Sequence, residues 1–202
     1  MQAGYNKSIA DVNKIVSHSN VMFQIFRDLI NNMICDGEVF MYTFGIRETQ
    51  DEDRDWIKRW LKFQWGAEIV IGHEQIYYPA DLPGFIAFEH ESKESIGLIT
   101  YQLTEDACEI ITLDSLREGI GVGNALIEAV KERARAFGRP RLWLVTTNDN
   151  LSALRFYQKR GFRIVKVNIG AVDRARQQKP EIPEIGDQGI HIRDEIEMEF
   201  LL

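Results

Sequence analysis

The chain has 202 residues, of which 45% are apolar and 27% are charged, so it is long enough for one compact domain with a hydrophobic core. Its formal net charge is −7 and no stretch is rich in Lys and Arg, which argues against nucleic acid as a partner, because phosphate binding depends on a positive surface. Two cysteines, Cys35 and Cys108, and four scattered histidines are too few ligands for a disulfide framework or a metal site.

The N-terminal residues 1–38 differ from the rest of the chain. Apolar residues recur at near-helical spacing from Ile9 to Ile34, and Asp36-Gly37 ends the pattern with residues typical of a turn. We expect a helical N-terminal extension that packs on the main domain or on a partner subunit. The most apolar early run, Val21–Cys35, is interrupted by charged and amide side chains, so it predicts neither a membrane span nor a signal sequence. The expected location is therefore cytoplasmic, with no membrane partner.

Residues 39–202 are expected to form one domain whose first half is mostly strand. Val39–Ile46 is predicted to be a strand, and Thr49-Gln50-Asp51-Glu52 is a capping-box pattern that opens a helix with an apolar side. Short β-like runs follow at residues 68–71, 75–78, 84–90, 95–103 and 108–113. Short polar connections between the later runs predict an antiparallel meander.

The second half alternates helices with strands. The pattern predicts helices over 122–137 and 150–160 and strands over 141–147 and 162–167. This alternation requires crossover connections and at least one parallel strand pair. After a Pro-containing segment, Ile190–Leu202 alternates apolar with acidic residues, which predicts a last strand with one wet face. The fold class is α/β (α+β), a mixed, mostly antiparallel sheet flanked by helices.

A glycine-rich loop, residues 118–123, leads into the helix at 122–137. Without Cβ atoms, Gly119, Gly121 and Gly123 let the main chain approach a ligand, and the first N–H groups of the helix point outward at its positive end. This arrangement is typical of a phosphate site, although close packing at a tight turn would also account for the glycines. The loop matches neither a P-loop, which ends in Gly-Lys-Ser/Thr, nor a GxGxxG fingerprint.

Two segments resemble the GNAT superfamily of acetyl-coenzyme A-dependent N-acetyltransferases. Residues 111–126 have the length and glycine placement of the family's strand–loop–helix motif, and residues 148–162 carry its Asn, Ala, Phe-Tyr and Gly-Phe pattern. The resemblance covers about residues 42–202 and implies a GNAT-like fold for them. One departure is Glu118, which stands where the family usually has Gln or Arg, while Arg117 lies one position earlier.

The resemblance implies that acetyl-CoA is the co-substrate and that its acetyl group passes directly to an amine of a small molecule or peptide. The Leu113 main chain would pair with the pantetheine arm, and Asn150 would bind the arm from the other side. The pyrophosphate would be held by main-chain amides of one continuous segment: Glu118, Gly119, Ile120, Gly121, Val122, Gly123 and Asn124.

The resemblance also implies two catalytic residues. Tyr157 matches the general acid near the departing sulfur, and we expect it to stabilise the developing thiolate by hydrogen bonding as much as by protonation, because a phenol is a weaker acid than a thiol. Phe156 and Tyr157 would alternatively be core aromatics of a helix. Glu109 is the best-placed base for the amine, although a carboxylate on a strand could equally face solvent. Strand alternation should place the neighbouring Cys108 in the core.

The sequence leaves open the function, the oligomeric state and the residues that contact the acceptor. The alternative function is a non-catalytic acyl-CoA-binding or sensing module of the same fold, and another is an interaction protein whose function resides in residues 1–38. A homodimer is also left open. Polar residues that could line the acceptor side are His73, Glu74, Tyr77, Tyr78, Asp194, Glu195 and Glu197.

Overall fold

The computed structural model describes residues 34–35, 38–39, 44–73, 75–186 and 188–202. The chain divides into two units, residues 1–43 and 44–202. In the first unit the described residues form a short antiparallel pair, β1 (Ile34–Cys35) with β2 (Glu38–Val39). The helical extension predicted for residues 1–38 otherwise lies outside the described residues. Ile34, the last residue of the apolar pattern, pairs with Val39 in an extended backbone.

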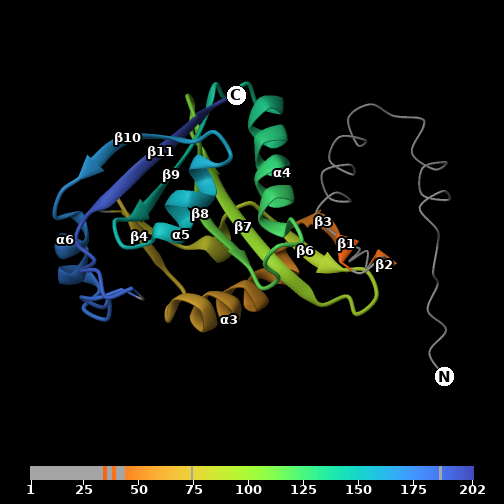
Figure 1. The fold of residues 1–202 in the computed structure, drawn as a ribbon, viewed down its shortest axis with the longest axis horizontal. Coiled ribbons are helices and arrows are strands. Elements are labelled where there is room, and N and C mark those ends of the chain that lie inside the picture. The colour runs from red at the N-terminus through yellow and green to blue at the C-terminus, as the bar shows by residue number, and fades with distance from the viewer. Residues whose placement is uncertain (1–33, 36–37, 40–43, 74, 187) are drawn as a thin grey trace. The chain divides into compact units, whose positions relative to one another are not determined.

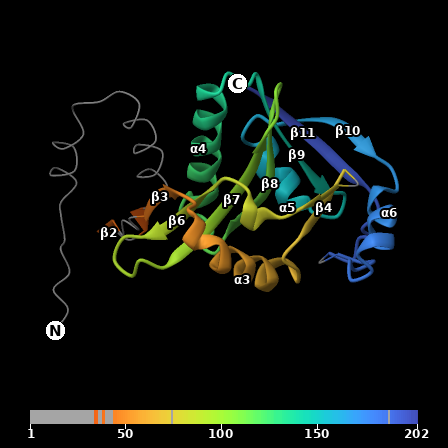
Figure 2. The ribbon, with the colours of Figure 1, turned by 180° about the vertical axis from the view of Figure 1, so that it is seen from behind.

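The second unit is built on a seven-stranded mixed sheet (Figures 1 and 2) with the order β10-β11-β9-β8-β7-β6-β3. Its strands are β3 (Phe44–Glu48), β6 (Gly84–Glu89), β7 (Ser95–Leu103), β8 (Cys108–Ser115), β9 (Arg141–Thr147), β10 (Arg163–Asn168) and β11 (Glu195–Leu201). Each neighbouring pair is antiparallel except β8 with β9. The predicted fold class, with a parallel pair at the crossover, is thus confirmed. A separate hairpin joins β4 (Val70–Gly72) to β5 (Gln75–Tyr77).

Helices cover both faces of this sheet. On one face α4 (Val122–Ala136) and α5 (Leu151–Gln158) contribute to the larger core, where Leu126, Ile127 and Val130 of α4 are fully buried. On the other face α3 (Arg54–Trp65) packs Ile57 and Leu61 against residues of β6 and β7. Successive strand side chains point to opposite faces, so the same strands serve both cores.

The N-terminal cap of the α3 region lies one residue later than the sequence predicts. Thr49 is engaged by the neighbouring strand, since its N–H donates to the Gly84 carbonyl at 2.9 Å. A short 3-10 turn, η1 (Asp51–Asp53), therefore precedes α3, and the Asp53 carboxylate accepts from the Gln50 N–H at 2.9 Å. Pairing between β3 and β6 has shifted the cap, because it takes Thr49 away from the helix.

The C-terminal part differs most from the prediction. The Pro-containing segment is preceded by a helix that the sequence pattern missed, α6 (Ala171–Gln178), which buries Ala171, Val172 and Ala175. The last strand, β11, starts at Glu195 and lies between β9 and β10. Its acidic face is not the wet face predicted, because the β4–β5 hairpin lies against it: Glu195 is only 4% exposed and accepts from the His73 N–H at 3.3 Å.

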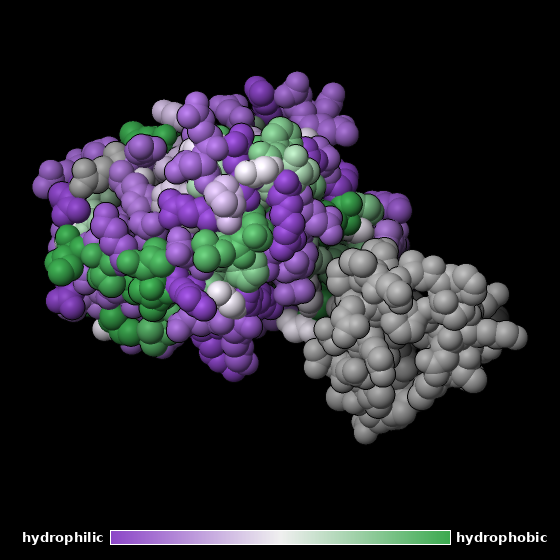
Figure 3. All heavy atoms as spheres, turned by 90° about the horizontal axis from the view of Figure 1, so that it is seen from above, coloured by the Kyte–Doolittle hydropathy of each residue, from purple (hydrophilic) through white to green (hydrophobic). Residues whose placement is uncertain are grey.

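The sheet ends at β10, which has one paired side. Ile164, Val165 and Val167 of this strand are each about half exposed. Figure 3 shows apolar patches within a mostly polar surface. Within the described ranges, no helix combines the length and apolarity needed to cross a bilayer.

Candidate active site

The centre of the site is an opening between β8 and β9. The two strands pair over only three positions, Cys108–Ile110 with Leu142–Leu144, although both continue further. On its other side β8 changes register against β7 between Thr100 and Tyr101, which leaves Ile111 as an extra residue. Such a bulge bends the strand that carries it. Beyond Ile110, β8 therefore diverges from β9.

The main chain of Leu113 points into this opening. Leu116 donates to the Ile96 carbonyl at 2.9 Å, which fixes a hydrogen-bonded pair of the β7–β8 ladder. Because such pairs alternate along an antiparallel ladder, Leu113 and Ile99 form a non-hydrogen-bonded pair. The N–H and C=O of Leu113 are thus turned away from β7, towards the side where β9 has separated.

The glycine loop presents a row of amide groups at the start of α4. The N–H groups from Glu118 to Asn124 donate to no described residue, and the first bond is Ala125 N–H to the Gly121 carbonyl at 3.0 Å. Gly119 and Gly121 have φ values of +80° and +90°, which other residues rarely adopt. The loop is therefore shaped by its glycines into an anion-binding helix terminus.

Gly123 has a different role from the other two glycines. A Cβ atom at this position would lie 3.0 Å from the Phe156 ring, so Gly123 allows α5 to pack against the start of α4. Nearby, Arg160 donates to the Asn124 side chain at 3.2 Å and stacks on Phe156. The predicted packing role of Phe156 thus extends to holding the glycine loop and α5 together.

The unusual charges at the loop entrance are explained by their surroundings. Arg117 pairs with Glu89 at 3.3 Å, at the end of β6, and so is held by a neighbouring strand. Glu118 is exposed. Its carboxylate can point into water while its main-chain N–H remains unpaired. Having Glu118 where the family usually has Gln or Arg therefore leaves the row of amides intact.

Helix α5 carries the second set of predicted residues. Asn150 caps the helix by accepting from the Ala153 N–H at 3.0 Å, a local role that the sequence analysis did not include. Tyr157 is 7% exposed and its ring packs edge-on against Phe156 and Phe162. Burial raises the pKa of its phenol, as does the negative charge of Asp114 on β8, whereas Arg160 opposes the shift. Tyr157 is therefore a neutral hydroxyl within electrostatic reach of the diverging part of β8.

Glu109 lies on the sheet face opposite the α4 core. The carboxylate is only 6% exposed and accepts a hydrogen bond from the Tyr77 hydroxyl at 3.2 Å. Burial raises the pKa of Glu109 to about 7, with smaller increases from Glu197 and Glu195, while Tyr77 and Arg141 oppose the shift. A carboxyl with this pKa can take up and release a proton near neutral pH. Cys108, its neighbour, is fully buried in the α4 core as predicted.

Glu109, Glu195 and Glu197 lie on one face of the sheet, here called the acidic face, and the β4–β5 hairpin covers it. Strand register places Trp143 beside Glu109, and Glu195 and Glu197 follow on β11. At the tip of the hairpin, the His73 ring lies 4.8 Å from the Trp143 ring and the His73 N–H donates to Glu195 at 3.3 Å. Of the predicted acceptor residues, the structure thus brings together His73, Tyr77, Glu195 and Glu197.

The remaining predicted acceptor residues lie elsewhere or cannot be placed. Asp194 accepts from the Gly170 N–H at 2.8 Å and so fastens the start of α6, Tyr78 is 59% exposed, and Glu74 lies outside the described residues. Trp143 and Arg141 were missed by the sequence analysis. Arg141 pairs with Glu199 at 3.2 Å, which neutralises that carboxylate. Only the β8–β9 register, which the sequence does not reveal, aligns Trp143 with Glu109.

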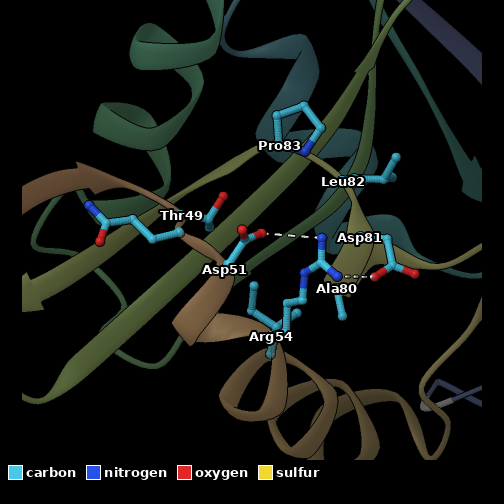
Figure 4. Close-up of a pocket in the computed structure, with 9 residues that line it drawn as sticks. Thr49, Asp51, Arg54, Ala80, Asp81, Leu82 and Pro83 are labelled. Atoms are coloured by element: carbon cyan, nitrogen blue, oxygen red, sulfur yellow. Dashed lines mark ion pairs between the residues drawn. The ribbon is translucent and has the colours of Figure 1, made fainter.

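A separate pocket of about 350 Å³ lies where η1 and α3 approach η2 (Pro79–Asp81) (Figure 4). Arg54 pairs there with Asp51 at 3.2 Å and with Asp81 at 3.6 Å. Neither Glu109 nor Tyr157 lines this pocket. Its cation is already neutralised by two carboxylates, so we assign it no part in the chemistry.

Comparison with known proteins agrees with this geometry. The acetyltransferase (GNAT) family model matches residues 47–162. The chain belongs to this family. It is also 42% identical to the uncharacterized protein YxbD of Bacillus subtilis, over 71% of this chain and 89% of that protein. It is 47% identical to the uncharacterized protein YdhI of the same organism, over 65% of this chain and 82% of that protein.

Solved GNAT structures share the fold. An IAA acetyltransferase from Bacillus cereus has a TM-score of 0.62 at 24% identity and covers 79% of this chain and 100% of its own. A GNAT family acetyltransferase from Elizabethkingia anophelis with acetyl-CoA bound has a TM-score of 0.54 at 20% identity, with 79% and 98% coverage. Family membership makes the chain an acetyltransferase, and the opening, amide row and α5 described above occupy its two GNAT motif segments.

The raised pKa of Glu109 predicts a stability change on mutation. Between an unfolded pKa of 4.5 and a folded pKa of about 7 the native state binds the extra proton, so its stability falls as pH rises through this window. The loss above pH 7 is at most about 3 kcal/mol. Glu109→Gln should therefore raise the free energy of unfolding by roughly 1–3 kcal/mol at pH 8 and by less at pH 5, measured with urea. Glu91→Gln, in the exposed turn after β6, is the control. A less stable Glu109→Gln protein at pH 8 would contradict the burial argument.

Proposed function

We propose that this protein binds acetyl-CoA in the opening between β8 and β9 and transfers the acetyl group directly to a cationic amine. The observation that carries this proposal is the row of unpaired amides from Glu118 to Asn124 beside an opening into which the Leu113 main chain points. The co-substrate would supply an activated acyl thioester. The residues proposed to bind acetyl-CoA and those proposed to act on the amine all belong to this chain.

The described groups fit such a ligand. Unpaired N–H groups at the positive end of α4 suit a pyrophosphate, because they add hydrogen bonds to a favourable dipole. The Leu113 N–H and C=O suit an extended amide-containing arm, which would add to the edge of β8 as another strand does. The side chain of Asn150 keeps its NH₂ group unused by the described residues, so it can donate to the same arm while its oxygen caps α5.

Tyr157 is proposed to act on the thioester sulfur of acetyl-CoA. Its hydroxyl forms no hydrogen bond with any described residue, and its raised pKa keeps it protonated. A neutral phenol held in a buried position can donate to a developing thiolate without first losing another partner. Its raised pKa also makes complete proton transfer less favourable, so hydrogen bonding would contribute most of the stabilisation.

Glu109 is proposed to act on the amine side. An amine attacks only when it is neutral, so an incoming ammonium must lose a proton. Glu109 can accept this proton when it is ionised, and its pKa of about 7 makes both states accessible. Its burial under the hairpin keeps bulk water from this carboxylate. The same buried base speaks against the sensing alternative, since binding alone has no use for it.

The acidic face is proposed to bind the acceptor. Glu195 is 4% exposed and forms no ion pair with a described residue, whereas Glu199 is paired with Arg141. An unpaired buried carboxylate is costly unless a positive ligand arrives. The His73 main chain donates to Glu195 and its ring lies 4.8 Å from the Trp143 ring, which also has the Arg141 guanidinium 5.5 Å from its centroid, so this face already holds one cation against an aromatic ring. The homodimer and the cytoplasmic location remain predictions; the half-exposed apolar side chains of β10 support the former.

Acetyl-CoA binding tests the first part of the proposal. Gly119→Asp should weaken binding by at least about tenfold in calorimetry, because it places a carboxylate in the amide row and strains a positive φ. Gly138→Asp is a matched control, since this glycine has a φ of +66°, open space around it and a place at the other end of α4. Equal losses in both variants would indicate a folding defect and remove the support for the loop site.

The catalytic part is tested at Tyr157. Tyr157→Phe should lower kcat by about a hundredfold to ten-thousandfold, with acetyl-CoA affinity nearly unchanged, because the hydroxyl acts on charge that develops only during the reaction. Tyr101→Phe removes another buried hydroxyl from the same core and should leave kcat nearly unchanged. A Tyr157→Phe enzyme with wild-type kcat would rule out the assigned role.

The acceptor part is tested at Glu195. Glu195→Gln should raise KM for a cationic amine by about tenfold and change kcat less, because it removes a charge that meets the bound cation. It should also lower the pKa of Glu109, since Glu195 raises it, and so move the acid limb of the pH–rate profile to lower pH. Glu199→Gln is the control on the same strand face. An unchanged KM in Glu195→Gln would exclude this residue from acceptor binding.

A further inference from the structure

Tyr77 lies between the proposed base and the protein surface. Its hydroxyl oxygen is 3.2 Å from Glu109 Oε2 and also 3.2 Å from Gln75 Oε1. A tyrosine hydroxyl has one proton and can donate to only one of these acceptors at a time. Tyr77 is itself 8% exposed, whereas Gln75, two residues earlier on β5, is exposed.

This arrangement gives each protonation state of Glu109 its own set of hydrogen bonds. When Glu109 is ionised, Tyr77 donates to it. When Glu109 is protonated, its O–H can donate to the Tyr77 oxygen, and Tyr77 can turn its own proton to Gln75. Both states are therefore satisfied without moving the backbone, which is required of a buried base that must cycle between them.

We propose that Tyr77, with Gln75 as its alternate acceptor, is the positioning residue of Glu109 and the outlet for the proton that Glu109 takes from the amine. This proposal rests on the proposed role of Glu109 as the base. It assigns the β4–β5 hairpin a part in proton release, in addition to covering the acidic face.

The proton transfers balance without any group beyond solvent water. The amine nitrogen loses a proton to Glu109, and the amine lone pair becomes free for attack. Glu109 then passes a proton to the Tyr77 oxygen as Tyr77 passes its own to a water molecule beside the exposed Gln75. Glu109 is again a carboxylate, Tyr77 is again a neutral phenol, and the proton has reached solvent. The acceptor can meanwhile occupy the acidic face.

Other groups close to Glu109 also shift its pKa. Glu195 and Glu197 on β11 raise its pKa and Arg141 on β9 lowers it, while the adjoining Cys108 thiol is held neutral because burial raises its pKa to about 12. The His73 ring contacts Trp143 on the same face. Among the uncharged side chains that the structure describes, Tyr77 is the one that donates a hydrogen bond to Glu109.

The test is a titration of the Glu109 carboxyl by NMR on protein containing isotope-labelled glutamate, with its signal assigned by its loss in Glu109→Gln. The wild-type midpoint should lie near pH 7. Tyr77→Phe should move it upward by about one pH unit, because the ionised form loses its donor. Gln75→Leu should move it downward by roughly a few tenths of a pH unit, because the protonated arrangement loses its acceptor. Tyr78→Phe, the exposed neighbour, should leave it unchanged.

The steady-state rate of acetyl transfer tests whether Tyr77 is the outlet for the proton. In Tyr77→Phe the rate should rise with buffer concentration, because a small buffer replaces the lost proton path, while wild type and Tyr78→Phe should show no such rise. An unchanged or lower midpoint in Tyr77→Phe, an upward shift in Gln75→Leu, or a buffer-independent Tyr77→Phe rate would each overturn the proposal. The titration needs no substrate, so it remains decisive even if no amine is acetylated, which would refute the proposed function instead.

Discussion

The early end of the β8–β9 pairing is the constraint on which the rest of the site depends. A single extra residue, Ile111, shifts β8 against β7 and bends it away from β9. If the two strands paired along their full length, the Leu113 main chain would be consumed by the ladder and no opening would exist. The bulge also changes which residues share a face, so that Glu109 and Thr112, three positions apart, lie on the same side of the sheet.

A row of amides that donate to no described residue and a buried carboxylate lie near this opening, and each is held by a different part of the fold. The amides from Glu118 to Asn124 stay free because glycines hold the loop in a conformation that directs them outward. Glu109 stays buried because the β4–β5 hairpin covers it and supplies one hydrogen bond from Tyr77. Polar groups without hydrogen-bond partners cost stability. Such costly features tend to occur at functional sites, within a structure whose other polar groups are satisfied.

The two faces of the sheet divide the proposed chemistry. Tyr157 belongs to the core under α4 and α5, whereas Glu109 belongs to the acidic face beneath the hairpin. The strands that separate them diverge at the opening, so a thioester lying there could be approached from both faces. Packing between Gly123 and Phe156, and the bond from Arg160 to Asn124, tie the loop to α5 and keep the sulfur side fixed relative to the amide row.

The sequence by itself determined the helices and strands of the main domain, α6 excepted, together with the strand–loop–helix glycines and the family, because local periodicity and short motifs specify these directly. It also predicted that Cys108 lies in the core and placed Tyr157 within a family motif, but it left open whether Glu109, on the strand before the glycine loop, faces the site or solvent. Only the tertiary structure decided that Glu195 is buried, because the β4–β5 hairpin lies against it, and that Trp143 and Tyr77 join Glu109. Thr49 lost its predicted cap role for a similar reason, namely pairing with a distant strand. Strand order and register are long-range properties, and no local pattern encodes them.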